Sequence, residues 1–157
     1  MSPQKTFFTM LGGVSLAVGF LAYQLLKSPY LDRDVSGPIT ISSEWSELTP
    51  DKPLKAERAE QELTLEFAEP VTPILEIWSL RLGDGSVTKP EAQLIDEQGE
   101  VSNLGSYALG PDGMGLYAGG GSSLPKDRKY VRARVRSDRP LKLSRVFWRC
   151  YNPWDKK

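Results

Sequence analysis

The chain has 157 residues, of which 20 are Lys or Arg and 20 are Asp or Glu, with no His and a single Cys. Without His, neither a Ser-His-Asp nor a Cys-His catalytic system can be built, and zinc and haem sites lose their usual ligands. A single Cys also excludes a disulfide within the chain, and we expect Cys150 to be buried. We therefore expect a protein that is not an enzyme and that holds no metal or other cofactor.

Charge is distributed unevenly along the chain. Residues 28–125 contain 6 Lys or Arg and 17 Asp or Glu. Residues 126–157 contain 12 Lys or Arg and only 3 Asp or Glu. Either the basic segment binds an acidic partner or anionic lipid, or its strands pair with acidic strands of the same sheet. Pairing within the sheet is the simpler interpretation. Nucleic acid is not an expected partner for a domain whose first part is acidic.

The first predicted element is a membrane anchor. Residues 7–26, FFTMLGGVSLAVGFLAYQLL, carry no charge, and a helix of that length spans about 30 Å, the thickness of the bilayer core. We predict that residues 1–27 form a single-pass signal anchor with a cytoplasmic N-terminus. The C-terminal domain is then periplasmic or extracellular. A cleaved signal peptide, with a small-x-small site at residues 17–19, is the alternative.

Small residues recur four apart within this anchor. Gly13 pairs with Ala17, and Ser15 pairs with Gly19. Such spacing lets the backbones of two membrane helices approach each other closely. We therefore predict that these four residues contact a neighbouring helix in the membrane.

A linker at residues 28–37 is predicted to lead into one β domain at residues 38–157. Its strands are marked by alternating or short apolar runs between turn residues. In chain order they are expected at 38–43, 62–67, 73–82, 92–96, 129–136 and 141–150. In the strand at 62–67, alternation places Leu63, Leu65 and Phe67 on one face and Glu62, Thr64 and Glu66 on the other. The strongly apolar run at 73–82 predicts a central strand. Asp84-Gly85 predicts a tight hairpin turn, and residues 96–99 predict another turn.

The second half of this domain contains a glycine-rich segment and the clearest strand. Residues 105–123 contain seven glycines and are expected to be the longest irregular loop, with a turn at 111–113. The strand at 129–136 is expected to face inward with Val131, Ala133 and Val135. We predict that it forms a hairpin with residues 141–148 across a turn at 137–140. A slip in the alternation near Ser144-Arg145 predicts a β-bulge.

Short strands separated by turns indicate a mainly β fold, an antiparallel β-sandwich of the jelly-roll type. Aromatic and basic residues near the C-terminal end are the expected contacts with a partner or with lipid. These candidate contact residues are Arg132, Arg134, Arg136, Tyr151 and Trp154. Tyr151 and Trp154 are expected to lie on an exposed tail after the last strand.

These features predict a membrane-anchored, non-catalytic accessory subunit. Its expected partners are the lipid bilayer and a larger membrane protein complex, such as a respiratory, photosynthetic or secretion assembly. A membrane-tethered domain that binds a glycan or another envelope polymer is the first alternative. A hydrolase that uses two carboxylates is the second, because 20 acidic residues are available and such chemistry needs no His.

Overall fold

The computed structural model describes residues 30–77, 79–110, 113–118 and 124–152. These residues are mainly β, as predicted, and contain one short 3-10 helix, η1 (Leu75–Ile77). The strands are β1 (Tyr30–Ser36), β2 (Ile39–Ile41), β3 (Ser46–Leu48), β4 (Leu54–Lys55), β5 (Glu60–Phe67), β6 (Thr72–Ile74), β7 (Ser79–Arg81), β8 (Val87–Thr88), β9 (Pro90–Asp96), β10 (Val101–Gly110), β11 (Gly113–Ala118), β12 (Lys129–Ser137) and β13 (Leu141–Tyr151).

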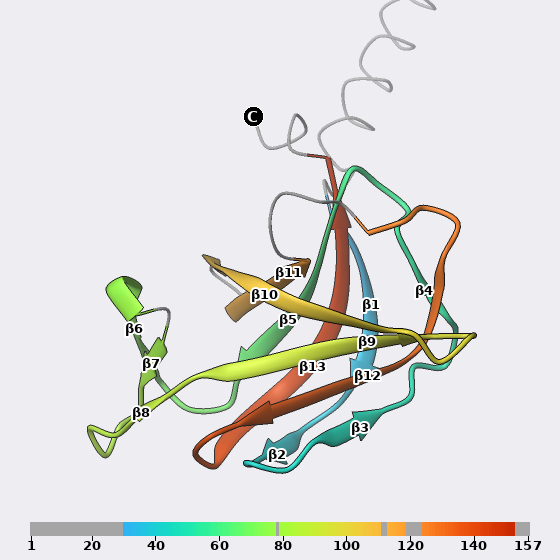
Figure 1. Cartoon of the computed structure of the whole chain (residues 1–157). Coiled ribbons are helices and arrows are strands. Elements are labelled where there is room, and N and C mark those ends of the chain that lie inside the picture. Colours follow the sequence, from blue (N-terminus) through green and yellow to red (C-terminus); the bar gives the residue numbers. More distant parts are fainter. Residues whose placement is uncertain (1–29, 78, 111–112, 119–123, 153–157) are drawn as a thin grey trace, which may run out of the picture.

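Ten of these strands form one antiparallel sheet that curls into a nearly closed barrel (Figure 1). Their order is β1-β13-β5-β11-β10-β9-β12-β3, with β2 beside β13 and β4 beside β12. In the part of the chain that the structure describes, no backbone pairing joins the end strands β1 and β3. The predicted antiparallel, mainly β class is therefore confirmed.

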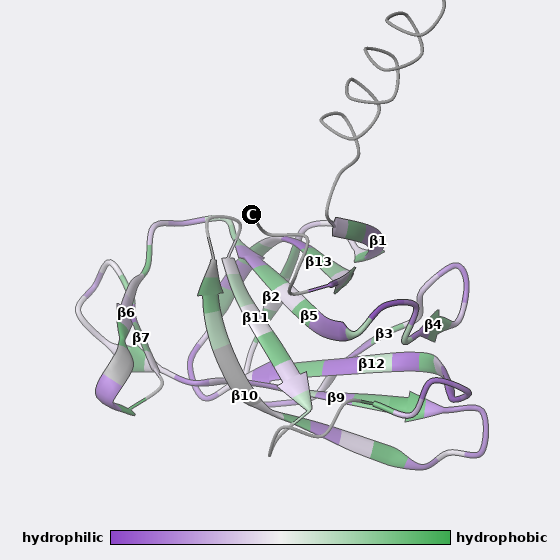
Figure 2. Ribbon diagram, turned by 90° about the horizontal axis from the view of Figure 1, so that it is seen from above, coloured by the Kyte–Doolittle hydropathy of each residue, from purple (hydrophilic) through white to green (hydrophobic). Residues whose placement is uncertain are grey.

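Apolar side chains fill the inside of the curled sheet, and hydrophobic and hydrophilic residues alternate along its long strands (Figure 2). On β12, Ala133 and Val135 are fully buried, as predicted. Tyr130 rather than Val131 joins them inside, because the register shifts between Tyr130 and Arg132. Trp148 on β13 is also buried, and its indole N–H donates a hydrogen bond of 2.9 Å to the Lys55 carbonyl. Aromatic rings thus form part of the core.

The last two strands do not pair with each other, and the predicted hairpin is wrong. β12 pairs with β9, β3 and β4, whereas β13 pairs with β1, β5 and β2. Both edges of each strand are therefore already occupied. The turn at 138–140 instead carries the chain from one side of the barrel to the other. The predicted bulge is confirmed, since the pairing of β13 with β5 shifts between Leu143 and Arg145.

The predicted central strand at 73–82 is also wrong. This segment divides into β6, η1 and β7, which with β8 form a separate three-stranded sheet that we call the arm. The arm lies to one side of the barrel in both views (Figures 1 and 2). Pro73 lacks an N–H group and the run carries a charge at Glu76, and both features disfavour a central strand. The Asp84-Gly85 turn is confirmed between β7 and β8, where Ser86 N–H donates to Asp84 at 2.9 Å.

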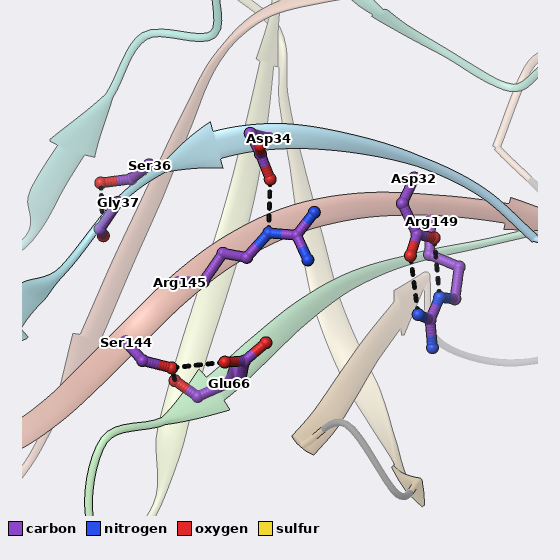
Figure 3. Close-up of polar contacts among 8 residues, drawn as sticks. All are labelled: Asp32, Asp34, Ser36, Gly37, Glu66, Ser144, Arg145 and Arg149. Carbon is purple, nitrogen blue, oxygen red and sulfur yellow. Dashed lines mark hydrogen bonds and ion pairs between the residues drawn. The ribbon is translucent and has the colours of Figure 1, made fainter.

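Two other segments are more regular than predicted. Most of the glycine-rich segment belongs to the hairpin of β10 and β11, in which Gly110 lies opposite Gly113. Residues 111–112 of its predicted turn lie outside the described residues. The predicted linker is also corrected at residues 30–36, which form β1 against β13. This charged segment forms a strand because Asp32 and Asp34 meet arginines on β13 (Figure 3).

Candidate functional site

Several predicted contact residues cannot be placed in this fold. The small residues of the anchor, Gly13, Ser15, Ala17 and Gly19, lie outside the described residues, and so does Trp154. Within the described residues, no helix is long and apolar enough to span a bilayer. The anchor and its helix contacts therefore stay predictions.

The predicted contact arginines lie on β12, and two of them meet carboxylates of neighbouring strands. Arg132 is 3.4 Å from the carboxylate of Glu47 on β3, and Arg136 is 2.6 Å from that of Glu91 on β9. Basic and acidic strands thus pair within one sheet, as the simpler interpretation of the charge distribution predicted. These pairs neutralise much of the charge that an acidic partner would recognise.

Arg134, the third predicted contact, belongs to a row of planar polar groups. Its Nε donates to the Gln93 side chain at 2.5 Å, and the Gln93 amide donates to Asn103 at 2.6 Å. The guanidinium groups of Arg134 and Arg136 also lie 5.1 and 4.5 Å from the ring centroid of Trp45. Such cation–π contacts stabilise the arginines where they are. The polar side chains on this face of β12 and β9 therefore already bind one another.

Tyr151 is not part of an exposed tail, which corrects that prediction. It is the last residue of β13 and only 6% exposed. Its ring lies 5.8 Å from that of Tyr30 on β1, and its hydroxyl lies 3.1 Å from that of Tyr117 on β11. We call these three residues the tyrosine cluster. Burial, together with hydrogen bonds to Glu62 and Tyr151, raises the pKa of Tyr117 far above its usual value, so the phenol stays neutral.

Ion pairs join β1 and β13 (Figure 3), and the arginines of these pairs also lie over aromatic rings. Arg149 donates to both carboxylate oxygens of Asp32 at 2.8 Å, and its side chain is only 10% exposed. Its guanidinium lies 4.3 Å from the ring centroid of Tyr30 and 4.8 Å from that of Phe147. Arg145 covers Phe147 as well, at 4.4 Å, and pairs with Asp34. Asp32 and Asp34 are thus occupied by arginines of the same sheet.

Sequence reasoning missed a buried polar pair on β5. The alternation along this strand placed Glu62 and Thr64 on a face opposite Leu63 and Leu65, yet both polar residues are buried. Thr64 donates to the Glu62 carboxylate at 3.0 Å. Glycine on β11 makes room for this carboxylate, because a Cβ atom at Gly115 would lie 2.7 Å from it. Only the pairing of β5 with β11, which is not a local signal, could have revealed this.

The arm carries apolar side chains that the core does not cover. Ile77 is 54% exposed and Val87 is 37% exposed, although Leu80 beside them is fully buried. A hollow of about 100 Å³ lies at the root of the arm. Its lining is Thr40, Glu69, Pro70, Val71, Leu82, Gly83, Pro140, Leu141 and Lys142. Val101 and Leu109 on β10 are exposed to a similar extent, at 46% and 39%, so the arm differs from the barrel by its separate sheet and not by exposure alone.

Buried hydroxyls attach the arm to the barrel. The Thr88 hydroxyl on β8 is within hydrogen-bonding distance of the Ser137 hydroxyl and donates to the Asp138 carboxylate. Thr88 is 1% exposed and Ser137 is fully buried. The backbone N–H of Lys89 donates to the same carboxylate at 2.9 Å. The arm is therefore held at the turn between β12 and β13 and is not a loose loop.

Cys150 is buried, as predicted, and burial raises the pKa of its thiol. Across the described ranges, no group of three or more His, Cys, Asp or Glu side chains is placed to hold a metal ion. No protein-family model, curated protein or solved structure matches this chain.

Proposed function

We propose that this protein is a non-catalytic accessory subunit that is anchored by residues 7–26 and docks on a larger membrane protein complex. The arm is the observation that carries the proposal. The most apolar run of the domain, at 73–82, lies outside the main sheet and leaves Ile77 54% exposed. Covering this apolar area with a partner would supply stabilisation that exposure forgoes.

The position of the arm suits contact with the exported part of a partner. The arm is attached at Ser137 and Asp138, just before β13 begins, and β13 then runs for 11 residues to Tyr151. A strand of that length spans about 33 Å. Tyr30, the first described residue after the predicted anchor, pairs with Tyr151. The arm is then far from the membrane, where only a partner with an exported domain reaches it.

The same geometry weighs against the two alternatives. A glycan site usually offers an exposed aromatic face for stacking, but two arginines lie over the ring of Trp45. A carboxylate hydrolase needs two available carboxyl groups in one cleft. Here the carboxylates of Asp32 and Asp34 form ion pairs with arginines, and the carboxylate of Glu62 accepts a hydrogen bond from the Thr64 hydroxyl. We therefore favour docking over both.

The finer description of the fold is part of the same proposal. We infer that the curled sheet is a distorted jelly-roll sandwich, with β1, β13, β5 and β11 in one layer and β9, β12 and β3 in the other. The long strand β10 pairs with β11 along one half and with β9 along the other, so it links both layers. The turn between β12 and β13 links the layers a second time, since its two strands pair with different neighbours.

Isolation of the full chain in mild detergent from its native membrane tests the function. We expect a membrane complex to co-purify with it. Gly13→Leu combined with Ala17→Leu should reduce recovery of the complex, since bulky residues keep helices apart while the anchor stays apolar. Ile77→Lys and Val87→Lys should also reduce it. Val101→Lys, at a residue on β10 that is 46% exposed, is the matched control outside the arm.

Two results would contradict this proposal in different ways. If the full chain elutes alone at every salt concentration, the accessory function fails and the glycan-binding alternative becomes the better one. If a complex co-purifies but the arm variants and Val101→Lys recover equal amounts, docking does not use the arm.

A further inference from the structure

We propose that the end of the barrel that carries the tyrosine cluster rests on phospholipid headgroups, so that the domain keeps one orientation on the membrane. Tyr30 and Tyr117, both partly exposed, would contact the headgroup layer, and the buried Tyr151 would hold them in place. This inference rests on the proposed function in one respect, because it requires residues 7–26 to span the bilayer. It does not require any protein partner.

A short tether is the first argument. Only residues 27–29 separate the apolar run from Tyr30, and a chain of that length reaches at most about 14 Å. The headgroup layer on each side of the bilayer core is about 5 to 8 Å thick. A folded domain of about 120 residues has a radius of gyration of about 14 Å. Since the tether is no longer than the radius of the domain, the Tyr30 end stays within or next to the headgroup layer.

The pairing of the strands brings more than one tyrosine to the end of the barrel that carries Tyr30. Tyr30 and Tyr151 are direct partners on β1 and β13, and their rings meet edge to face at 5.8 Å. Tyr117 comes from β11 and reaches the Tyr151 hydroxyl at 3.1 Å. Tyrosine is enriched at membrane interfaces because its ring is apolar and its hydroxyl is polar. Two strands, β1 and β11, thus present partly exposed tyrosines at the end of the domain next to the predicted anchor, and the buried Tyr151 on β13 lies between them.

The charges near this end determine which lipid it needs. Arg149 lies over the Tyr30 ring but is paired with Asp32, and Arg33 is paired with Glu57. Paired charges attract anionic lipid weakly, because the attraction and the repulsion largely cancel. We therefore expect the contact to form on zwitterionic phosphatidylcholine and to change little with salt. A contact that depended on anionic lipid would instead weaken as salt screens the charges.

This contact would fix the height of the arm. β13 runs from the root of the arm to the tyrosine cluster, so the root would be held about 30 Å from the headgroups. A domain that tumbled on its tether would present the arm at many heights. With its orientation fixed, the arm meets only partners whose exported part extends to that level.

Distances between the domain and the lipid surface test the proposal. The full chain is reconstituted in phosphatidylcholine vesicles with a headgroup-attached energy acceptor and without any partner. A donor dye is placed on Glu60→Cys, next to the tyrosine cluster, or on Val87→Cys, on the arm. Cys150 should not react in the folded protein, because it is 1% exposed and burial raises its pKa. We expect strong energy transfer from position 60 and weak transfer from position 87, at both low and high salt.

The double variant Tyr30→Ser with Tyr117→Ser should reduce the difference between the two positions, while Val101→Ser should preserve it. Equal transfer from positions 60 and 87 in the chain with both tyrosines would overturn the proposal, whether or not the double variant folds. A preference that appears only with anionic lipid would overturn it in favour of an electrostatic contact. Release of the chain from membranes by alkaline carbonate would show that residues 7–26 do not span the bilayer. That result would contradict both the lipid contact and the accessory function. Absence of a co-purifying complex would contradict only the proposed accessory function and not the lipid contact.

Discussion

Asp32 on β1 and Arg149 on β13 lie opposite each other, and the guanidinium donates to both carboxylate oxygens at 2.8 Å. The Arg149 side chain is only 10% exposed, so its charge is poorly solvated and depends on this carboxylate. We expect Asp32→Ala to lower the free energy of unfolding by roughly 2 to 4 kcal/mol, because removal of one member of a buried pair leaves the other charge poorly compensated. Urea denaturation of the variant measures this loss.

The exposed pair of Lys142 and Glu69 is the control. Their side chains are 63% and 62% exposed, and their charged atoms lie 2.7 Å apart. Exposed pairs contribute about 0 to 1 kcal/mol, because water screens both charges. We expect Glu69→Ala to fall in that range. Equal losses for the two variants would mean that burial does not strengthen the dependence of Arg149 on Asp32.

A second prediction concerns two glycines with positive φ angles. Gly113, where β11 begins, has a φ of +137°, and a Cβ atom there would lie 2.1 Å from the Leu65 carbonyl oxygen. Gly99, in the turn before β10, has a φ of +84° with open space around it. Gly99→Ala should therefore cost only the strain of the backbone, about 1 to 2 kcal/mol. Gly113→Ala should cost clearly more, because the backbone of β5 must also move.

Thermal denaturation compares the two variants directly. Equal melting temperatures would show that β11 can shift away from β5 at Gly113 without loss of packing. A much lower melting temperature for Gly113→Ala would confirm that the close approach of the two strands is tight.

The local features of the fold were predictable from the sequence. Alternation placed Ala133 and Val135 inside, and the slip near Ser144 located the bulge, because both signals depend only on neighbouring residues. Pairing between strands was not predictable in the same way. The short turn between β12 and β13 suggested a hairpin. Instead, β12 pairs with β9 and β13 pairs with β5, so these two strands occupy the edges that a hairpin would use.

The candidate sites were less predictable than the fold. A polar strand face is normally exposed, so the burial of Glu62 and Thr64 depends on strands far away in the sequence. The apolar run at 73–82 suggested a core strand because hydrophobicity does not reveal whether the core has room for it. Opposite charges along the chain were more informative. They indicated pairing within the sheet, which Arg132 with Glu47 shows.

The last prediction concerns acid and the attachment of the arm. Asp138 accepts hydrogen bonds from the Thr88 hydroxyl and from the Lys89 backbone N–H. Burial alone would raise the pKa of Asp138, but these hydrogen bonds outweigh burial and hold the pKa below its usual value. Because the pKa is lower in the folded chain than in the unfolded one, the ionised carboxylate stabilises the fold above about pH 4. This stabilisation is lost as the pH falls through the folded pKa.

Asp138→Asn keeps an oxygen that can accept both hydrogen bonds but removes the titrating group. We expect this variant to be less stable than the parent at pH 7, and the difference should shrink steadily below about pH 4. Urea unfolding across that range measures it, and hydrogen exchange of the arm amides shows whether the arm opens first. Asp51→Asn, in the exposed loop between β3 and β4, is the control. A difference between parent and Asp138→Asn that stays constant down to pH 2 would show that the charge of Asp138 does not hold the arm.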